Sequence, residues 1–190
     1  MRIIVLALIL LAVIGLWWFF RARTKEAAQQ EATSAGTDAG RRLRSRMLSA
    51  PPESFGVTPT AAFPRIFAVL MDWPVGKDVV TVFSAHDGTA SLYTTFSFGM
   101  IGAGEVSASV RAAATAFVQM ADHFFDSSTP TTTFPYPTSD QVRFHLLTYD
   151  GVRVIVTARV PLEQGTSEYS GLFNQGQAVL TEIRRSDNDR

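Results

Sequence analysis

An α+β fold class is predicted for this chain: an N-terminal transmembrane helix, then one small domain in which an antiparallel sheet of two hairpins is combined with a crossing helix and a C-terminal helix. Three observations predict it. Eighteen residues without a charge occupy 3–20. Two segments with alternating apolar residues each turn on an Asp-Gly dipeptide, at 87–88 and 150–151. Apolar residues recur at helical spacing over 105–125 and 167–185.

The uncharged run is long enough to cross a bilayer. At about 1.5 Å per residue it covers roughly 27 Å, close to the hydrocarbon thickness of about 30 Å. Aromatic residues and then cations follow at its exit, as is typical of a membrane interface. A cleaved secretory signal needs a shorter run and small residues at its cleavage site, and the exit has neither. We therefore expect an uncleaved anchor over residues 1–23, marked by Ile3, Leu10, Trp17, Trp18, Phe19, Phe20, Arg21 and Arg23.

The charges around this run predict its orientation. Only Arg2 and the terminal amine precede it, whereas residues 21–46 hold seven basic residues against three acidic ones. Basic flanks remain on the cytoplasmic side of a membrane. We therefore expect a single-pass membrane protein whose C-terminal domain lies in the cytoplasm.

Residues 24–56 are predicted to be a polar and basic linker. The segment is rich in Ala, Ser, Gly and Gln and has few large apolar side chains, so it can bury little surface. Pro51 and Pro52 are expected to end any helix that begins near its arginines. Two interpretations of these arginines remain open, a solvated charge run or contact with anionic lipid. The arginines are Arg41, Arg42, Arg44 and Arg46.

The globular domain is predicted over residues 57–190, and its first half combines a helix with a hairpin. Helical spacing of apolar residues predicts a helix over 64–72, with a proline at its first position. β-Branched residues predict a strand over 79–85, and alternation predicts a second strand over 91–98. The turn chemistry of residues 86–89 joins them into a hairpin.

The second half of the domain repeats this alternation of helix and hairpin. The principal helix is predicted over 105–125, because its apolar residues recur at intervals of three and four. A loop follows over 126–140, where Ser, Thr and Pro are frequent. Strands over 142–149 and 152–159 form the second hairpin. A last helix over 167–185 completes the domain.

Composition and charge exclude several kinds of site. Residues 47–190 hold nine basic and fourteen acidic residues, and this sign is unsuited to the phosphates of nucleic acid, which is not expected as a partner. The chain has no cysteine, so disulfides and thiolate chemistry are excluded. Its three histidines include no pair at i, i+4. We therefore predict no metal site and no cofactor.

No convergent catalytic group is apparent in the sequence. Ser84, His86 and Asp87 lie close together, but a hairpin turn points neighbouring side chains apart, and catalytic triads assemble from distant segments. The turn itself explains Asp87. The glycines at 99, 102 and 104 match neither nucleotide-binding pattern, G-x-G-x-x-G or G-x-x-x-x-G-K-[ST]. The chain is therefore not expected to be an enzyme.

The order helix, hairpin, long helix, hairpin, helix resembles the roadblock and longin-like α/β folds. Three segments carry this resemblance: FSAHDGTASLY, VRAAATAFVQMADHFF, and RFHLLTYDGVRVIVTA leading into GLFNQGQAVLTEIR. No signature residue marks it, and the second hairpin lacks the third strand that roadblock domains usually place before their last helix. The resemblance implies a non-catalytic dimerising module that binds a small GTPase or a trafficking assembly.

The leading hypothesis is a membrane-tethered, non-catalytic interaction domain, an accessory or scaffold subunit of a membrane-associated assembly. The expected partners are the lipid bilayer and either another protein or a second copy of the chain. Strand aromatics often anchor interfaces, so the expected interface contains Tyr93, Phe96 and Tyr149. Two alternatives remain open: a membrane-anchored immunity protein that neutralises a toxin, and an enzyme or ligand-binding domain whose pocket the sequence does not reveal.

Overall fold

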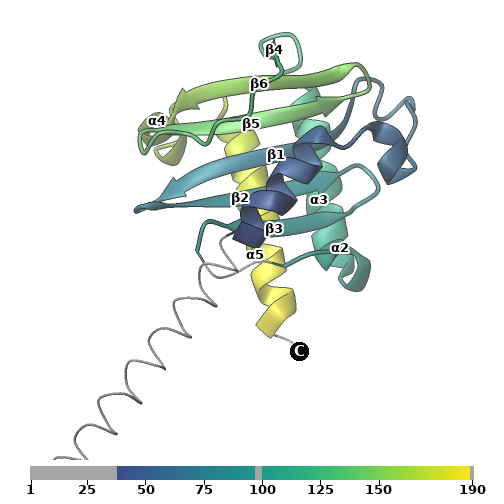
Figure 1. Ribbon diagram of the computed structural model, residues 1–190, viewed down its shortest axis with the longest axis horizontal. Helices are drawn as coiled ribbons and strands as arrows, with labels where there is room; N and C mark the ends of the chain where they lie inside the picture. Colours follow the sequence, from purple (N-terminus) through teal and green to yellow (C-terminus); the bar gives the residue numbers. More distant parts are fainter. Residues whose placement is uncertain (1–37, 97–99, 189–190) are drawn as a thin grey trace, which may run out of the picture.

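An antiparallel sheet forms the central layer of the computed structural model, which describes residues 38–96 and 100–188. Its six strands have the order β3-β2-β1-β5-β6-β4. Two long helices cover one face of the sheet, and a shorter helix over residues 38–49 crosses the other face (Figure 1). The α+β class predicted from the sequence is confirmed.

The first three strands form a meander. β1 (Ile66–Val75) pairs with β2 (Asp78–Ala85), and β2 pairs with β3 (Ala90–Thr94). Gly76 and Gly88 occupy the two turns with φ of 64° and 90°, a left-handed conformation that glycine adopts without steric cost. The hairpin predicted here is confirmed, although its second strand ends at Thr94 rather than at residue 98.

The helix predicted over 64–72 is wrong, because this segment forms most of β1. Residues 66–72 are all buried, and β1 lies in the middle of the sheet between β2 and β5. A strand buried on both faces has a continuous apolar sequence, and periodicity alone does not distinguish such a run from a buried helix. Trp73 and Pro74, expected to stop a helix, continue the strand opposite β2.

The two long helices are confirmed, and they enclose the larger of two apolar clusters. α3 (Ala108–Asp122) follows the short α2 (Ala103–Val106), and its N-terminus is capped by Ser107, whose hydroxyl accepts a hydrogen bond from the Val110 amide. α5 (Ser170–Asn188) packs beside α3. The side chains buried between these helices and the sheet include Met71, Phe117, Phe144, Leu146, Leu172, Phe173 and Ile183.

The second hairpin is also confirmed. β5 (Gln141–Thr148) and β6 (Gly151–Ala158) pair along their whole length. Two short elements beside this hairpin were not predicted: β4 (Thr129–Thr131), which pairs with the outer side of β6, and α4 (Arg159–Glu163), which follows β6 in the chain. β4 lies inside the segment predicted to be a loop.

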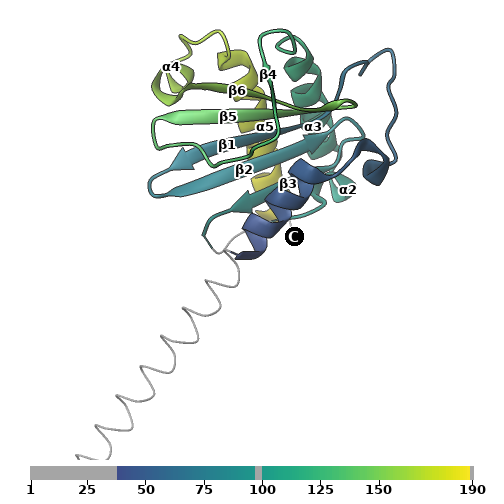
Figure 2. The ribbon, with the colours of Figure 1, turned by 45° about the horizontal axis from the view of Figure 1, so that its top comes forward.

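The described part of the predicted linker, residues 38–56, packs on the sheet and so belongs to the domain. The helix over 38–49 runs from β3 toward β1 (Figure 2), and η1 (Pro52–Phe55) follows it. Leu48 is 2% exposed and Arg44 is 4% exposed. The smaller apolar cluster lies under this helix and contains Leu48, Val57, Phe67, Ala68, Leu70, Phe83, Ala85, Tyr93 and Leu147.

Within the ranges that the structure describes, no helix combines the length and the apolar character needed to cross a bilayer. The predicted anchor over residues 1–23 lies outside those ranges. So does the first part of the predicted linker, residues 24–37. The anchor, its orientation and the cytoplasmic placement of the domain remain predictions.

Candidate functional site

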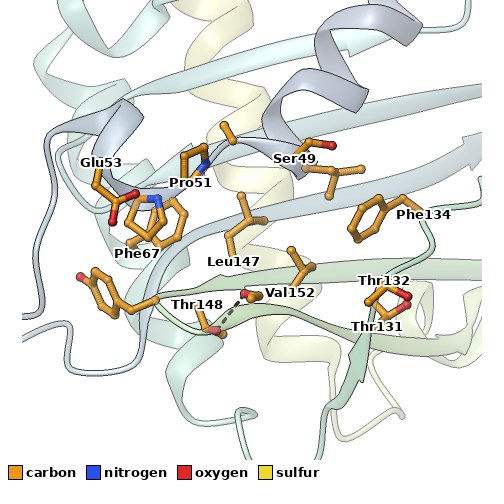
Figure 3. Close-up of a pocket in the computed structure, with 15 residues that line it drawn as sticks. Ser49, Pro51, Glu53, Phe67, Thr131, Thr132, Phe134, Leu147, Thr148 and Val152 are labelled. Carbon is orange, nitrogen blue, oxygen red and sulfur yellow. Dashed lines mark hydrogen bonds between the residues drawn. The ribbon is translucent and has the colours of Figure 1, made fainter.

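A groove of about 490 Å³ opens on the sheet face that carries helix 38–49 (Figure 3). Its floor is apolar and comes from the three adjacent strands β1, β5 and β6. One wall is the end of helix 38–49 with η1, and the other is the segment that follows β4. The lining residues include Phe67, Leu147 and Val152 on the floor, Ser49 and Glu53 on one wall, and Thr131, Thr132 and Phe134 on the other.

A β-bulge directs Phe67 into this groove. The register of β1 against β5 shifts between Ile66 and Ala68. As a result, Phe67 and Ala68 both belong to the smaller apolar cluster, whereas strict alternation would place them on opposite faces. Bulges re-aim side chains in this way, often beside functional sites. The Phe67 ring lies 5.6 Å from the ring of Tyr149, another lining residue.

The wall opposite the helix is formed by the start of a strap, defined as residues 132–140, which joins β4 to β5 (Figure 3). The Thr131 hydroxyl donates to the Thr133 carbonyl and accepts from the Thr133 amide, which fixes the bend at the end of β4. Phe134 then lies over the sheet, where its ring meets the ring of His145 edge-on at 5.7 Å.

The one charged residue that lines the groove, Glu53, is negative. Glu53 is exposed, and Asp150, also exposed, lies between the lining residues Tyr149 and Gly151. No Lys, Arg or His side chain is among the residues that line the groove. The rim otherwise carries hydroxyls, so the groove combines an apolar floor with a polar and anionic rim.

A buried polar cluster lies next to the groove and is centred on Asp72 of β1. The Arg44 guanidinium donates from Nε to both carboxylate oxygens of Asp72, at 2.9 and 3.0 Å, and from Nη2 to Oδ2. The Thr81 hydroxyl donates to Oδ1 at 2.6 Å, and His145 Nε2 lies 3.4 Å from Oδ2. All four side chains are buried.

Sheet geometry brings three of these residues together. Thr81 lies directly opposite Asp72 in the β1–β2 pairing, and His145 of β5 projects from the same face. Arg44 reaches them from helix 38–49, and its Nη1 also donates to the Phe134 carbonyl at 2.9 Å. The Tyr136 ring covers the guanidinium at 4.2 Å. One arginine thus connects the helix, the strap and the sheet.

Asp72 is ionised at neutral pH. Burial alone would raise its pKa, but hydrogen bonds with His145 and Arg44 and the positive charge of Arg44 outweigh this, so that the pKa of Asp72 is lower than usual. The carboxylate, Arg44 and Thr81 are enclosed, and a ligand on the surface does not reach them. The cluster therefore positions the walls of the groove and does not itself present a reactive group.

The three aromatics predicted to form an interface do not form one surface. Tyr93 is 2% exposed and belongs to the smaller apolar cluster, so it is not available to a partner. Phe96 is exposed beyond the end of β3. Tyr149 is partly buried, and its hydroxyl donates to the Thr58 carbonyl at 3.0 Å. Tyr149 alone contributes to the groove.

Ser84, His86 and Asp87, which are close together in sequence, do not form a catalytic triad in the structure. Ser84 is buried within β2, and the His86 ring stacks on Phe63 at 4.8 Å. Asp87 accepts a hydrogen bond from the Thr89 amide, as expected for a turn residue. Among the residues with described positions, no group of three His, Asp or Glu side chains is placed to hold a metal ion.

Sequence reasoning missed Arg44, Asp72, Phe67 and Phe134. One signal was present, since Asp72 is a single charge inside the apolar run IFAVLMDWPV, and a charge at such a position needs a buried partner. For Arg44 the signal was its helical spacing, since it precedes Leu48 by four residues and would share one helix face with it. The eight residues predicted to mark the membrane anchor all lie outside the described ranges.

No protein-family model matches the chain, and no curated protein or solved structure is significantly similar to it. No function is therefore transferred from a relative. The resemblance to roadblock and longin-like domains was predicted from an order of elements that begins with a helix, and that first helix is strand β1, so this part of the predicted order is wrong. The rest of the resemblance stays a prediction.

Proposed function

We propose that the chain is a membrane-tethered interaction domain, an accessory subunit of a membrane-associated assembly, that binds an extended segment of a partner protein in the groove beside helix 38–49. The observation that carries this proposal is the groove itself, which has an apolar floor, hydroxyl-bearing walls and an anionic rim. Residues 1–23 provide the tether in this proposal, because their uncharged run is long enough to span.

The shape and lining of the groove support a polypeptide segment as its occupant. Phe67, Leu147 and Val152 offer apolar contacts, and burial of apolar area favours binding by about 25 cal/mol per Å². An extended chain also carries amides and carbonyls that need partners. The hydroxyls of Ser49 and Thr132 lie on opposite walls, where they can satisfy some of these groups.

The charge of the rim supports a cationic residue in that segment. Glu53 lines the groove and is exposed, and Asp150 is exposed in the turn between the lining residues Tyr149 and Gly151; neither forms an ion pair with a described residue. A complementary Lys or Arg would speed encounter and exclude acidic competitors. The proposed occupant is therefore an extended segment with apolar side chains and at least one basic residue.

Selection from a displayed library of linear peptides tests this proposal with the full chain in detergent micelles. Enriched peptides are expected to combine alternating apolar residues with Lys or Arg. Val152→Trp fills the floor of the groove and should reduce their binding at least tenfold, whereas Glu53→Lys should disfavour the basic peptides.

Val156→Trp is the matched control, because Val156 lies on the same face of β6 but outside the groove and is already exposed. It should leave peptide binding unchanged, and both tryptophan variants should unfold as cooperatively as the parent. Failure to enrich any sequence class, or equal losses at Val152 and Val156, contradicts the proposed site.

A further inference from the structure

We infer that the outward face of helix 38–49 docks on an anionic bilayer surface through Arg41, Arg42 and Arg46. This inference rests on the tether in the proposed function and adds an interaction surface to it. The three side chains are exposed, and none forms an ion pair with any residue whose position is described. The fourth arginine of the run, Arg44, points the opposite way, into the sheet.

Helix geometry separates these arginines into two sets. At about 100° per residue, Arg42 and Arg46 project directly away from Arg44 and the sheet, and Arg41 lies at the flank. The Arg41 guanidinium lies 5.7 Å from the centre of the Tyr136 ring, which holds it beside the strap. Ser45 and Ser49 share the exposed side of the helix, and Asp38 in its first turn is the one carboxylate among residues 38–49, so three arginines face outward against a single acid.

The helix is fixed on the sheet, so this face keeps one orientation relative to the domain. The buried bonds of Arg44 to Asp72 prevent the helix from rolling about its axis. Close packing at the other end has the same effect, because a Cβ atom at Gly40 would lie only 2.5 Å from the Thr94 carbonyl oxygen. The outward arginines therefore form a surface with a fixed position on the domain.

The charge of the remainder of the domain makes this face distinctive. Residues 47–190 hold nine basic and fourteen acidic residues, which gives a formal charge of −5. An anionic membrane attracts each basic residue near its surface, and it repels the acidic remainder. The attraction of the outward arginines favours the orientation in which helix 38–49 faces the bilayer.

The length of chain before the helix permits this contact. Fourteen residues, 24–37, separate the predicted anchor from the first described residue of the helix, and they span at most about 50 Å when extended. The arginines consequently stay within reach of the headgroups of the membrane that holds the chain. The groove lies on the same face of the sheet, so docking would present it to a partner segment at the membrane interface.

Single-cysteine labelling tests the inference in the full chain, which has no cysteine of its own. A fluorophore at Ser45→Cys reports the outward face of helix 38–49. A matched fluorophore at Ala112→Cys reports the exposed side of α3 on the opposite face of the sheet. The chain is reconstituted into neutral phosphatidylcholine vesicles or vesicles with about 30% phosphatidylserine, each containing headgroup-quencher lipids.

We expect quenching at Ser45 on anionic vesicles only, and little quenching at Ala112 on either. Each arginine replaced by glutamine should lower the ratio of docked to undocked protein about fivefold, which corresponds to about 1 kcal/mol per charge. Salt at about 0.5 M should weaken quenching in the same direction. Arg42→Lys should retain it, because the attraction depends on charge.

Equal quenching on neutral and anionic vesicles, or no effect of the triple glutamine variant, would overturn the inference. A change in the fluorescence of the Ser45→Cys probe with soluble polyglutamate, but not with anionic lipid, would also overturn it. That result would assign the face to an acidic protein. Association with neutral vesicles that resists carbonate extraction measures the membrane anchor separately from docking. Loss of that association contradicts the anchor in the proposed function and also removes the basis for docking, whereas peptide binding in the groove is measured independently in micelles.

Discussion

Arg44 and Asp72 form a two-pronged ion pair, 28 residues apart in sequence, between helix 38–49 and the central strand of the sheet. Both side chains are buried, and Thr81 and His145 complete the surroundings of the carboxylate. A buried pair of this kind stabilises the folded state little relative to apolar residues, but loss of one partner leaves a buried charge uncompensated. The position of the helix therefore depends on both residues.

Replacement of Arg44 by alanine is expected to lower the free energy of unfolding by about 3–5 kcal/mol, because Asp72 then lies buried without its cation. Urea unfolding followed by circular dichroism measures this change. Arg42→Ala is the matched control, since this neighbour is exposed and its loss should stay within about 0.5 kcal/mol. Equal effects of the two substitutions would show that the pair does not hold the helix.

The double variant Arg44→Met with Asp72→Leu should be more stable than Arg44→Ala, because it removes the carboxylate that the single change leaves unpaired. Coupling between contacting residues of this kind amounts to about 0.5–3 kcal/mol. The same urea titration measures it. If the losses of stability in Arg44→Met and in Asp72→Leu simply add up to the loss in the double variant, a direct interaction is contradicted.

Acid should destabilise the domain through Asp72. Its pKa is lower in the folded state than the ordinary value, so the unfolded chain binds a proton first as the pH falls. The stabilising contribution is complete above the unfolded pKa of about 3.9 and is lost as the pH falls through the folded pKa. When thermal unfolding is measured between about pH 7 and pH 2, the melting temperature should begin to fall near pH 4 to 5. Asp72→Asn should be less stable at neutral pH and show a smaller decline, and an unchanged acid limb would contradict this assignment.

The start of the folding unit is a further prediction. From composition, residues 24–56 form a linker, and a chain beginning at Pro52 should fold. The packing of Leu48 and Arg44 indicates instead that a chain beginning at residue 38 folds cooperatively and that one beginning at Pro52 loses several kcal/mol, because Asp72 and Leu70 lose their cover. Calorimetry of the two chains distinguishes these expectations. Equal melting temperatures would restore the linker assignment.

The parts of the fold that local sequence specifies were predictable. The stripes of α3 and α5 follow helical spacing, and the β5–β6 hairpin turns at Asp150 and Gly151. β1 was not predictable in the same way, because both of its faces are buried and its apolar residues therefore show no alternation. Helix 38–49 was assigned to a linker because only three of its residues, Leu43, Met47 and Leu48, are large and apolar.

The candidate site was less predictable than the fold. The groove depends on a bulge that turns Phe67 onto the same face as Ala68, and no turn residue or proline in the sequence marks this bulge. Arg44 and Phe134 meet across 90 residues through a bond to a backbone carbonyl, for which the identity of residue 134 carries no information. Such contacts follow from tertiary packing and not from periodicity.

The aromatic residues expected at an interface give the last prediction. Tyr93 is buried in the smaller apolar cluster, so Tyr93→Arg places an unpaired charge in that cluster and should abolish cooperative unfolding at about 25 °C. Phe96 is 42% exposed at the end of β3, so Phe96→Arg should change the free energy of unfolding by less than about 1 kcal/mol. Tyr149→Phe removes the hydroxyl that donates its one proton between the Thr58 and Phe63 carbonyls and should cost about 1 kcal/mol. Near-ultraviolet circular dichroism and urea titration of the three variants measure these differences. A Tyr93→Arg variant that folds cooperatively and self-associates more weakly would contradict the burial of Tyr93. That result would support the interface expected from the sequence.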